Sequence, residues 1–163
     1  MPPIISIVGE SKSGKTTLIE SLISELKSRG YRVATIKHSI HNLNFDKSGK
    51  DSWRHIHAGS AATVVVSPNQ VVIIKPMSTE HDLEEIADLL GDDYDIILAE
   101  GFKQSRSPKI EAHRKAAGPP LAGLKDVVAI ATDEPLQTKT SQFSLNDIKG
   151  LADFLENVFM KMR

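Results

Sequence analysis

The sequence predicts an α/β fold, with a mostly parallel β-sheet, helices on both of its faces and an added β-hairpin. Two observations carry this prediction. Short apolar, β-branched runs at residues 4–8 and 94–99 have the pattern of strands buried on both faces, and the first leads directly into a helical periodicity. Strands then alternate with helices along the chain, which is the order typical of a parallel sheet.

The first half of the chain begins with the strand at 4–8, which ends at Gly9. A helix follows whose apolar positions recur between residues 18 and 26, and Gly30 marks its C-terminal end. Residues 31–36 form the second predicted strand. Residues 37–59 are polar and rich in histidine, and we expect a long loop or an irregular helix there. Apolar runs at 61–66 and 71–75 flank a Ser-Pro-Asn-Gln turn and predict the hairpin.

The second half opens with a helix over residues 83–90, for which Thr79 and Asp82 form a predicted capping box. Strands are expected at 94–99, 109–113 and 127–131. The last helix has an apolar stripe between residues 145 and 162, and Ser144 and Asp147 form its predicted capping box. We expect one domain over residues 1–163, which is a common domain length.

The composition restricts the classes of partner. Twenty Lys and Arg residues against 21 Asp and Glu residues give a net charge of -1, so no overall field attracts nucleic acid or an anionic membrane. The chain has no cysteine, which excludes disulfides and thiolate zinc sites and is compatible with a reducing compartment. Because no targeting sequence and no run of 18 apolar residues is found, we expect a cytoplasmic protein.

A phosphate-binding loop lies between the first strand and the first helix. Residues 9–16, GESKSGKT, match the pattern GxxxxGK[ST] in the strand–loop–helix context that gives the motif its meaning. Backbone N–H groups of such a loop surround a phosphate, and the helix N-terminus adds further donors. The residues expected to bind nucleotide here are Gly9, Ser11, Lys12, Ser13, Gly14, Lys15, Thr16 and Thr17.

A Mg²⁺ site is expected beside this loop. The hydroxyl of Thr16 is one ligand, and a carboxylate at the C-terminal end of another buried strand is the usual second partner. Glu100 occupies that position after the strand at 94–99. Asp95 is the rival carboxylate, but it precedes the apolar run and is expected near the opposite end of the strand.

The histidine-rich stretch has three interpretations. Its histidines include His38, His41, His55 and His57, but neither the His-x₂-His nor the His-x-His spacing is the i, i+4 pair of a zinc-protease helix. A metal site, a solvated polar loop and an anion-binding surface therefore remain open. We favour the last, because cations that follow the second strand lie on the same sheet edge as the phosphate loop. The candidate residues for a cofactor or partner anion are Lys37, His38, His41, Lys50, Asp51, Arg54 and Lys103.

Asp133 is the candidate for recognition of the base. It follows the strand at 127–131, the position from which many phosphate-loop proteins contact the base. A carboxylate there can accept hydrogen bonds from both N1–H and the 2-amino group of guanine, whereas adenine offers no such pair of donors. The alternative is an ordinary turn aspartate before Pro135.

These segments together resemble the MobB family of GTP-binding accessory proteins in molybdopterin-guanine dinucleotide biosynthesis. The resemblance extends almost from end to end and rests on several motifs, of which the phosphate loop alone is the least specific. The matching segments are SGKTTL at 13–18, IKH at 36–38, FDKSGKDS at 45–52, AGS at 58–60, AEGFK at 99–103, PKI at 108–110, ATDEPL at 131–136 and DIKGLADFL at 147–155.

The resemblance implies a small α/β protein that binds GTP and Mg²⁺, usually as a homodimer, with the hairpin as a source of dimer contacts. It also implies an accessory role toward the guanylyltransferase that attaches GMP to the molybdenum cofactor, with molybdopterin as a second ligand. Lys15 and Thr16 match the nucleotide site and Glu100 its magnesium side. Glu10 departs from the small residues that are commoner at its position, and a carboxylate there would repel phosphate unless it points away.

Two functional hypotheses follow. The first is a GTP-binding adaptor with at most slow hydrolysis, because no glutamine or arginine is evidently placed to orient water or stabilise the transition state. No catalytic residue is assigned on this hypothesis. The second is an ATP-dependent small-molecule kinase or dethiobiotin-synthetase-like ligase, in which Lys37 and the histidine-rich stretch hold the acceptor.

Overall fold

The computed structural model describes residues 1–41, 45–77 and 81–160 of the 163-residue chain. The chain divides into two compact units, Met1–His38 with Asp82–Arg163, and Ser39–His81, and each is described here by itself. The single domain expected over residues 1–163 stays a prediction. Thr79, expected in a capping box, lies outside the described residues.

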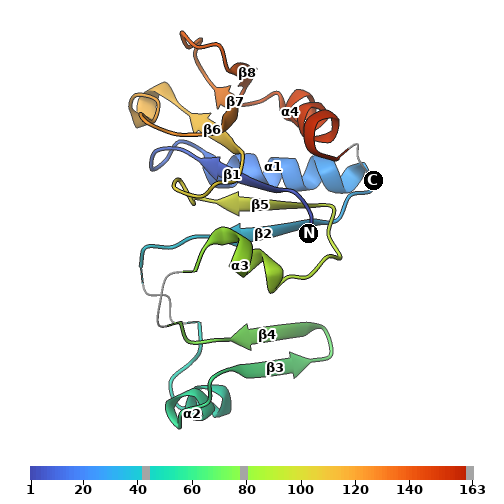
Figure 1. Cartoon of the computed structure of the whole chain (residues 1–163), viewed down its shortest axis with the longest axis vertical. Coiled ribbons are helices and arrows are strands. Elements are labelled where there is room, and N and C mark those ends of the chain that lie inside the picture. Colours follow the sequence, from blue (N-terminus) through green and yellow to red (C-terminus); the bar gives the residue numbers. More distant parts are fainter. Residues whose placement is uncertain (42–44, 78–80, 161–163) are drawn as a thin grey trace. The chain divides into compact units, whose positions relative to one another are not determined.

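The first unit contains a six-stranded sheet in the order β2-β5-β1-β6-β7-β8, in which every neighbouring pair is parallel (Figure 1). The α/β prediction with a mostly parallel sheet is therefore confirmed. The edge strand β8 was not predicted. The strands are β1 (Ile4–Val8), β2 (Val33–Lys37), β5 (Ile96–Glu100), β6 (Lys109–His113), β7 (Val127–Thr132) and β8 (Ser141–Ser144).

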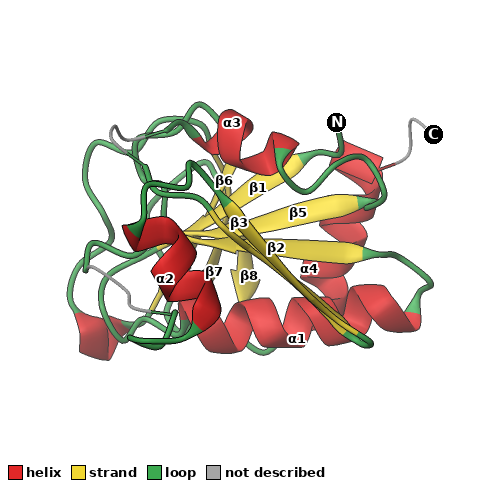
Figure 2. Cartoon of the chain, turned by 90° about the horizontal axis from the view of Figure 1, so that it is seen from below, coloured by secondary structure: helices red, strands yellow, loops and turns green. Residues whose placement is uncertain are grey.

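Helices cover both faces of this sheet, and Figure 2 shows α1 and α3 on opposite sides of it. Because successive residues of a strand face opposite sides, Ile5 and Ile7 pack with Leu22 of α1, while Ile4 packs with Leu83 of α3. A fully buried leucine such as Leu22 contributes about 1.5 to 3 kcal/mol through its removal from water. The helices are α1 (Lys15–Ser28), α3 (Leu83–Asp88) and α4 (Ile148–Leu155), with a 3-10 turn at Lys115–Ala117 and a π-helical turn at Glu156–Met160.

Both later helices begin with an aspartate as the N-cap. Asp82 accepts a hydrogen bond from the Glu85 N–H at 2.9 Å, and Asp147 accepts one from the Gly150 N–H at 3.0 Å. The predicted capping box with Ser144 as the cap is wrong, because Ser144 ends β8 and α4 starts after Asp147. An aspartate that follows a turn satisfies the first helical N–H groups directly, so α4 begins three residues later than a cap at Ser144 predicts.

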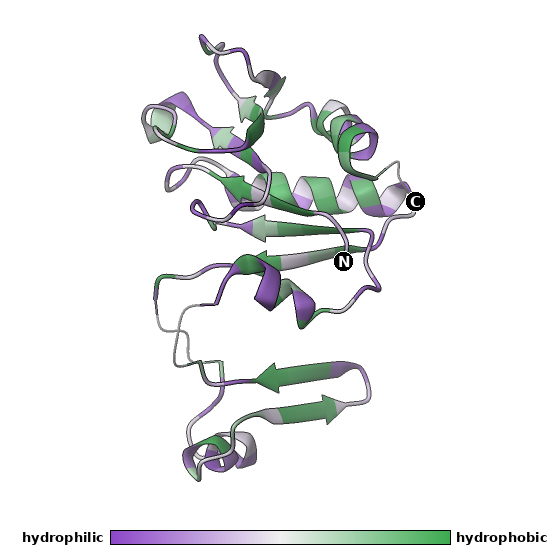
Figure 3. Ribbon diagram, viewed as in Figure 1, coloured by the Kyte–Doolittle hydropathy of each residue, from purple (hydrophilic) through white to green (hydrophobic). Residues whose placement is uncertain are grey.

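The second unit consists of α2 (Asp51–His57) and the hairpin of β3 (Thr63–Ser67) with β4 (Gln70–Ile74). The strands pair antiparallel, from Thr63 opposite Ile74 to Ser67 opposite Gln70, which confirms the predicted hairpin. Figure 3 shows both strands as hydrophobic. Their valines are nevertheless exposed; Val66, for example, is 71% accessible. The polar stretch at 37–59 was predicted to be a long loop or an irregular helix. It contains the short helix α2.

In residues 1–41, 45–77 and 81–160, no helix combines the length and the apolar character needed to cross a membrane.

Candidate functional site

The loop that joins β1 to α1 has the geometry of a phosphate-binding loop. A Cβ at Gly9 would lie 2.4 Å from the Ala112 carbonyl oxygen and 2.4 Å from Ser13 Oγ, so only glycine fits between this loop and β6. Gly14 precedes α1 with φ of 94°, in the left-handed region that glycine adopts most easily. The two glycines thus fix where the loop leaves the sheet and where the helix begins.

The side chains of the loop divide into inner and outer positions. Ser13 Oγ is buried and has no hydrogen-bond partner among the described residues, so the inside of the loop contains an unsatisfied polar atom. Ser11, Lys12, Thr16 and Thr17 are exposed. Lys12 has φ of 63°, a conformation that a non-glycine residue adopts at some energetic cost.

Lys15 folds back over the loop. Its Nζ donates hydrogen bonds to the Glu10 carbonyl oxygen at 2.7 Å and the Gly9 carbonyl oxygen at 3.2 Å. Burial lowers the pKa of Lys15, and the Glu100 carboxylate opposes this effect while the charge of Lys103 adds to it. The ammonium group therefore lies among backbone oxygens and next to two further charged groups.

Glu100 connects the loop to the neighbouring strands. The strand order β2-β5-β1 brings together the C-terminal ends of three strands, because all three are parallel. Thr16 Oγ1 lies 3.2 Å from each carboxylate oxygen of Glu100, and Lys37 Nζ lies 3.1 Å from Oε1. Thr16 and Glu100, the two expected Mg²⁺ ligands, therefore lie next to each other, whereas Asp95 accepts from the Arg32 N–H at 2.7 Å before β5 begins.

A hydroxyl and a carboxylate are hard oxygen donors of the kind that Mg²⁺ prefers. Thr16 Oγ1 and Glu100 are close enough to coordinate one ion together, so these residues fit Mg²⁺. Among the described residues, no group of three or more His, Cys, Asp or Glu side chains is arranged to hold a metal. A magnesium ion that is shared with phosphate oxygens does not need such a group.

The turn after β5 lies beside the same edge. Gly101 and Phe102 have φ values of 94° and 57°, and a Cβ at Gly101 would lie 3.3 Å from His38 Cβ. The His38 N–H donates to the Glu100 carbonyl oxygen at 3.0 Å, and the rings of His38 and Phe102 lie 5.0 Å apart. The tight turn thus places Lys103 close enough to Lys15 to affect its pKa.

The other predicted anion-site residues belong to the second unit. His41, Lys50, Asp51 and Arg54 are all exposed there. The structure therefore brings Lys37, His38 and Lys103 together in the first unit and assigns the remaining four candidates to the second.

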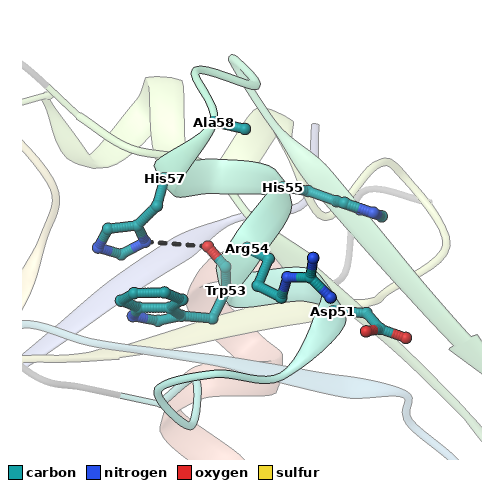
Figure 4. Close-up of a pocket in the computed structure, with 6 residues that line it drawn as sticks. All are labelled: Asp51, Trp53, Arg54, His55, His57 and Ala58. Atoms are coloured by element: carbon teal, nitrogen blue, oxygen red, sulfur yellow. Dashed lines mark hydrogen bonds between the residues drawn. The ribbon is translucent and has the colours of Figure 1, made fainter.

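In the second unit, α2 forms a shallow pocket, and Figure 4 shows the side chains that line it. Trp53 and His57 stack with ring centroids 3.6 Å apart, and His57 Nδ1 is hydrogen-bonded to the Trp53 carbonyl oxygen at 2.9 Å. Asp51, Arg54, His55 and Ala58 complete the lining. Sequence reasoning did not single out Trp53, although its i, i+4 spacing from His57 would have suggested the stack.

Arg114 is a second residue that sequence reasoning missed. It directly follows β6, and its Nε would lie 3.2 Å from a Cβ at Gly14, so the guanidinium lies against the phosphate loop. With Gly14 and Thr17 it lines a small pocket of about 150 Å³ that also includes Asn146. The signal in the sequence was a cation directly after a predicted strand. Only the strand order shows that this strand is next to β1.

Asp133 follows β7 at the same edge of the sheet, as predicted. Its Oδ1 accepts a hydrogen bond from the Lys115 N–H at 2.9 Å, which fixes the orientation of an otherwise exposed carboxylate. Behind it, the buried His113 lies 3.0 Å from the Glu134 carboxylate. The polar groups after β6 and β7 therefore support one another.

Comparisons of the sequence with known proteins agree on one family. Residues 4–133 match the family model described as "MobB: Molybdopterin guanine dinucleotide synthesis protein B". The chain is 42% identical over 160 residues to a molybdopterin-guanine dinucleotide biosynthesis adapter protein of Haemophilus influenzae, which covers 95% of this chain and 88% of the relative. It is 38% identical to the protein of that name from Escherichia coli K12, with 95% and 92% covered.

Solved structures agree with the sequence matches. A crystal structure of molybdopterin-guanine biosynthesis protein B superimposes with a TM-score of 0.74 at 28% identity and covers 95% of this chain and 99% of that one. A MobB protein homologue from Bacillus stearothermophilus gives a TM-score of 0.71 at 26% identity, with 98% and 99% covered.

Proposed function

The chain belongs to the MobB family, and from this premise we propose that it is a GTP-binding adapter of molybdenum cofactor biosynthesis. The resemblance predicted from the sequence motifs is thereby confirmed, and the alternative of an ATP-dependent kinase or ligase has no support from the relatives. In the proposed role, the protein assists the guanylyltransferase that forms molybdopterin guanine dinucleotide. The observation that carries the proposal is the phosphate loop with Lys15, Thr16 and Glu100 at one sheet edge.

The proposed nucleotide site uses backbone and side chains together. The N–H groups of the loop and of the α1 N-terminus bind the phosphates, and Lys15 exchanges its carbonyl partners for phosphate oxygens. Thr16 and Glu100 hold Mg²⁺, which neutralises part of the triphosphate charge. Glu10 supports this arrangement in one respect, because it is exposed and offers its backbone carbonyl, not its carboxylate, to Lys15.

Asp133 is the proposed reader of the guanine base. One of its oxygens already accepts from the Lys115 N–H, and a carboxylate oxygen can accept more than one hydrogen bond. Two donors of guanine therefore find acceptors on Asp133, whereas adenine presents a donor next to an acceptor. The preference for GTP over ATP rests on this carboxylate.

The main role that we propose is binding, with hydrolysis at most slow. Among the described residues, Arg114 is the cation beside the loop that the sequence did not reveal, and we assign it to contact with the nucleotide phosphates. Arg114 removes one of the two grounds for expecting slow hydrolysis, so the proposal rests on the other, which concerns a glutamine that orients the attacking water. Gln142 is already engaged elsewhere, because its side chain accepts a hydrogen bond from the Leu136 N–H and donates one to the Leu136 carbonyl oxygen.

The second unit is the proposed contact surface for molybdopterin or the guanylyltransferase. Lys50 and Arg54 supply exposed cations, and the Trp53–His57 stack supplies an aromatic surface beside them. The hairpin is the proposed site of homodimer formation, because an isolated two-stranded sheet with exposed valines is only marginally stable in water. We further propose a cytoplasmic location, which fits a chain without cysteine.

A reconstituted reaction tests the adapter role. Purified guanylyltransferase, molybdopterin and Mg·GTP are incubated with or without this protein, and formation of the dinucleotide is followed by chromatography. We expect the wild-type protein to increase the initial rate and Lys15→Ala to lose this effect. Lys27→Ala is the matched control, because Lys27 lies in the last turn of α1, away from the loop. Equal stimulation by Lys15→Ala and wild type would contradict the proposal.

A further inference from the structure

A pocket lined by Glu111 lies on the face of the sheet opposite α1. Ile110 and Ala112 of β6 pack in the cluster that includes α1, so Glu111 between them faces the other side. Two connecting segments border the pocket, one between β6 and β7 and one between β7 and β8. Its volume is about 340 Å³, which is within the range of small-ligand sites.

Within the described part of the chain, Glu111 is the one charged residue in the lining of this pocket. The residue is only 4% exposed, and its Oε1 accepts a hydrogen bond from the Leu121 N–H at 2.7 Å. Among the residues that the structure describes, this is the one hydrogen bond to the Glu111 carboxylate, and Oε2 is not among the buried oxygens that lack a partner, so it faces the open space of the pocket. One carboxylate oxygen is therefore available to accept hydrogen bonds from a ligand in the pocket.

Lys109, the positively charged residue nearest to Glu111 in the sequence, does not form an ion pair with the Glu111 carboxylate. Lys109 is two residues earlier on the same face of β6 and fully buried. Its Nζ donates instead to the carbonyl oxygens of Ser105 at 2.7 Å and Ser107 at 3.0 Å. The ammonium group is thus directed to the loop before β6, and the Glu111 carboxylate is left for another donor.

Apart from Glu111, the residues that line the pocket are mainly apolar. Leu121, Leu124, Ile130 and Leu136 supply apolar surface, and Thr138 adds a hydroxyl. Apolar walls around one buried carboxylate suit a flat ring that carries hydrogen-bond donors along one edge. Two adjacent N–H donors can engage the two oxygens of one carboxylate at the same time.

We propose that this pocket is a second ligand site, specific for a 2-amino-4-oxopyrimidine ring, the ring system that guanine and pterin share. Its ring N–H and 2-amino group donate to Glu111, and its faces pack between the leucines. Adenine is rejected, because a ring nitrogen acceptor beside its amino group meets the carboxylate. The proposal deepens the proposed function and rests on it only for the expectation that the pterin, not guanine, is the natural occupant. Of the two partners proposed for the second unit, it leaves that unit the guanylyltransferase.

Binding of two simple probes tests the site. Neopterin and guanosine carry the ring without a triphosphate, and adenosine is the control ring. Calorimetry with the full-length protein is expected to show binding of neopterin, weaker or no binding of guanosine and none of adenosine. Guanosine binding that is equal to or tighter than neopterin binding, and that Glu111→Gln weakens, assigns the pocket to guanine and overturns the pterin expectation. The absence of binding by either ring overturns the whole inference.

Two variants connect binding to the pocket. Glu111→Gln keeps the shape but replaces an acceptor by a donor, and we expect neopterin affinity to fall about 10- to 100-fold, as for loss of a charge-assisted hydrogen bond. Leu136→Trp narrows the pocket without altering the carboxylate, so it decides the question if Glu111→Gln does not fold. Unchanged affinity in the folded variants would overturn the inference.

The nucleotide site provides the comparison that separates the two proposals. Lys15→Ala is expected to lose GTP binding but to retain neopterin binding, and Glu111→Gln is expected to do the reverse. If GTP binds through Lys15 while neopterin fails to bind, only the second site is refuted. If GTP fails to bind and neopterin binds through Glu111, the proposed nucleotide function is refuted and the pocket stands.

Discussion

Neutralising Glu100 is expected to change GTP binding in opposite directions with and without Mg²⁺. Glu100→Gln keeps an oxygen that accepts from Thr16 Oγ1 and Lys37 Nζ, which lie 3.2 Å and 3.1 Å from the carboxylate. The substitution therefore removes a charge and little else. In the presence of Mg²⁺ the Glu100 carboxylate is a ligand of the ion. Without Mg²⁺ its negative charge repels the triphosphate.

The structure gives the size of both effects. The Glu100 side chain is 17% exposed, so its charge is only partly screened by solvent. Loss of a charged ligand costs about 1.5 to 3 kcal/mol, which lowers the affinity for Mg·GTP about 10- to 150-fold. Without Mg²⁺, removal of repulsion between charges roughly 7 Å apart contributes about 0.6 to 2.4 kcal/mol, depending on the local dielectric, and tightens binding of free GTP.

Isothermal titration calorimetry with GTP, in excess Mg²⁺ and in EDTA, measures both effects. Asp95→Asn is the matched control, because Asp95 directly precedes the same strand, at the end opposite Glu100, and accepts from the Arg32 N–H at 2.7 Å. We expect this control to leave both affinities unchanged. Equal weakening of GTP binding by Glu100→Gln in Mg²⁺ and in EDTA would refute the assignment of Glu100 to the metal.

Three further substitutions test other parts of the structure. Gly9→Ala places a Cβ 2.4 Å from the Ala112 carbonyl oxygen, so calorimetry should show loss of GTP binding and about 1 to 3 kcal/mol of destabilisation; Gly91→Ala, with open space around it, should retain GTP binding. Tyr31→Phe removes the hydrogen bond at 2.7 Å that most strongly lowers the pKa of Glu156, so urea unfolding should show about 1 kcal/mol of destabilisation at neutral pH. Because the folded pKa of Glu156 is lowered, that difference is present above its usual pKa and is lost as the pH falls through the lowered value; a difference that grows on acidification would contradict it. Val66→Lys should weaken self-association in sedimentation velocity, whereas Leu89→Lys, at 55% exposed a comparable surface position in the first unit, should not.

The sequence predicted the central strands because their residues are mostly apolar. Ile4–Val8 and Ile96–Glu100 are buried along almost their whole length. A short, nearly continuous apolar run of this kind is typical of a strand that is buried on both faces. The edge strand Ser141–Ser144 has no apolar run, and only its hydrogen bonds to β7 define it. The capping box predicted at Ser144 failed, because Asp147 itself is the cap of α4.

The sequence predicts the part of the candidate site that one contiguous motif forms. It predicts less well the residues that are brought to the site by the order of the strands. Residues 9–16 are contiguous, so the loop was predicted in full. Glu100 was found because carboxylates at strand ends are typical partners of the loop. Arg114 was missed, because its place beside Gly14 depends on β6 lying next to β1, which sequence spacing does not reveal. Glu111 was missed since a polar residue in a short strand indicates nothing about the loops that cover it.

Competition between GTP and ATP for the purified protein, in the presence of Mg²⁺, tests the central claim most directly. A fluorescent guanine nucleotide is displaced by each unlabelled nucleotide, with Lys15→Ala as the control for binding at the loop and Asp133→Asn as the test of base recognition. We expect GTP to displace the probe at a concentration at least about tenfold lower than ATP, a difference of about 1.4 kcal/mol. We further expect Asp133→Asn to reduce this difference. Tighter binding of ATP than of GTP by the wild-type protein would contradict the claim.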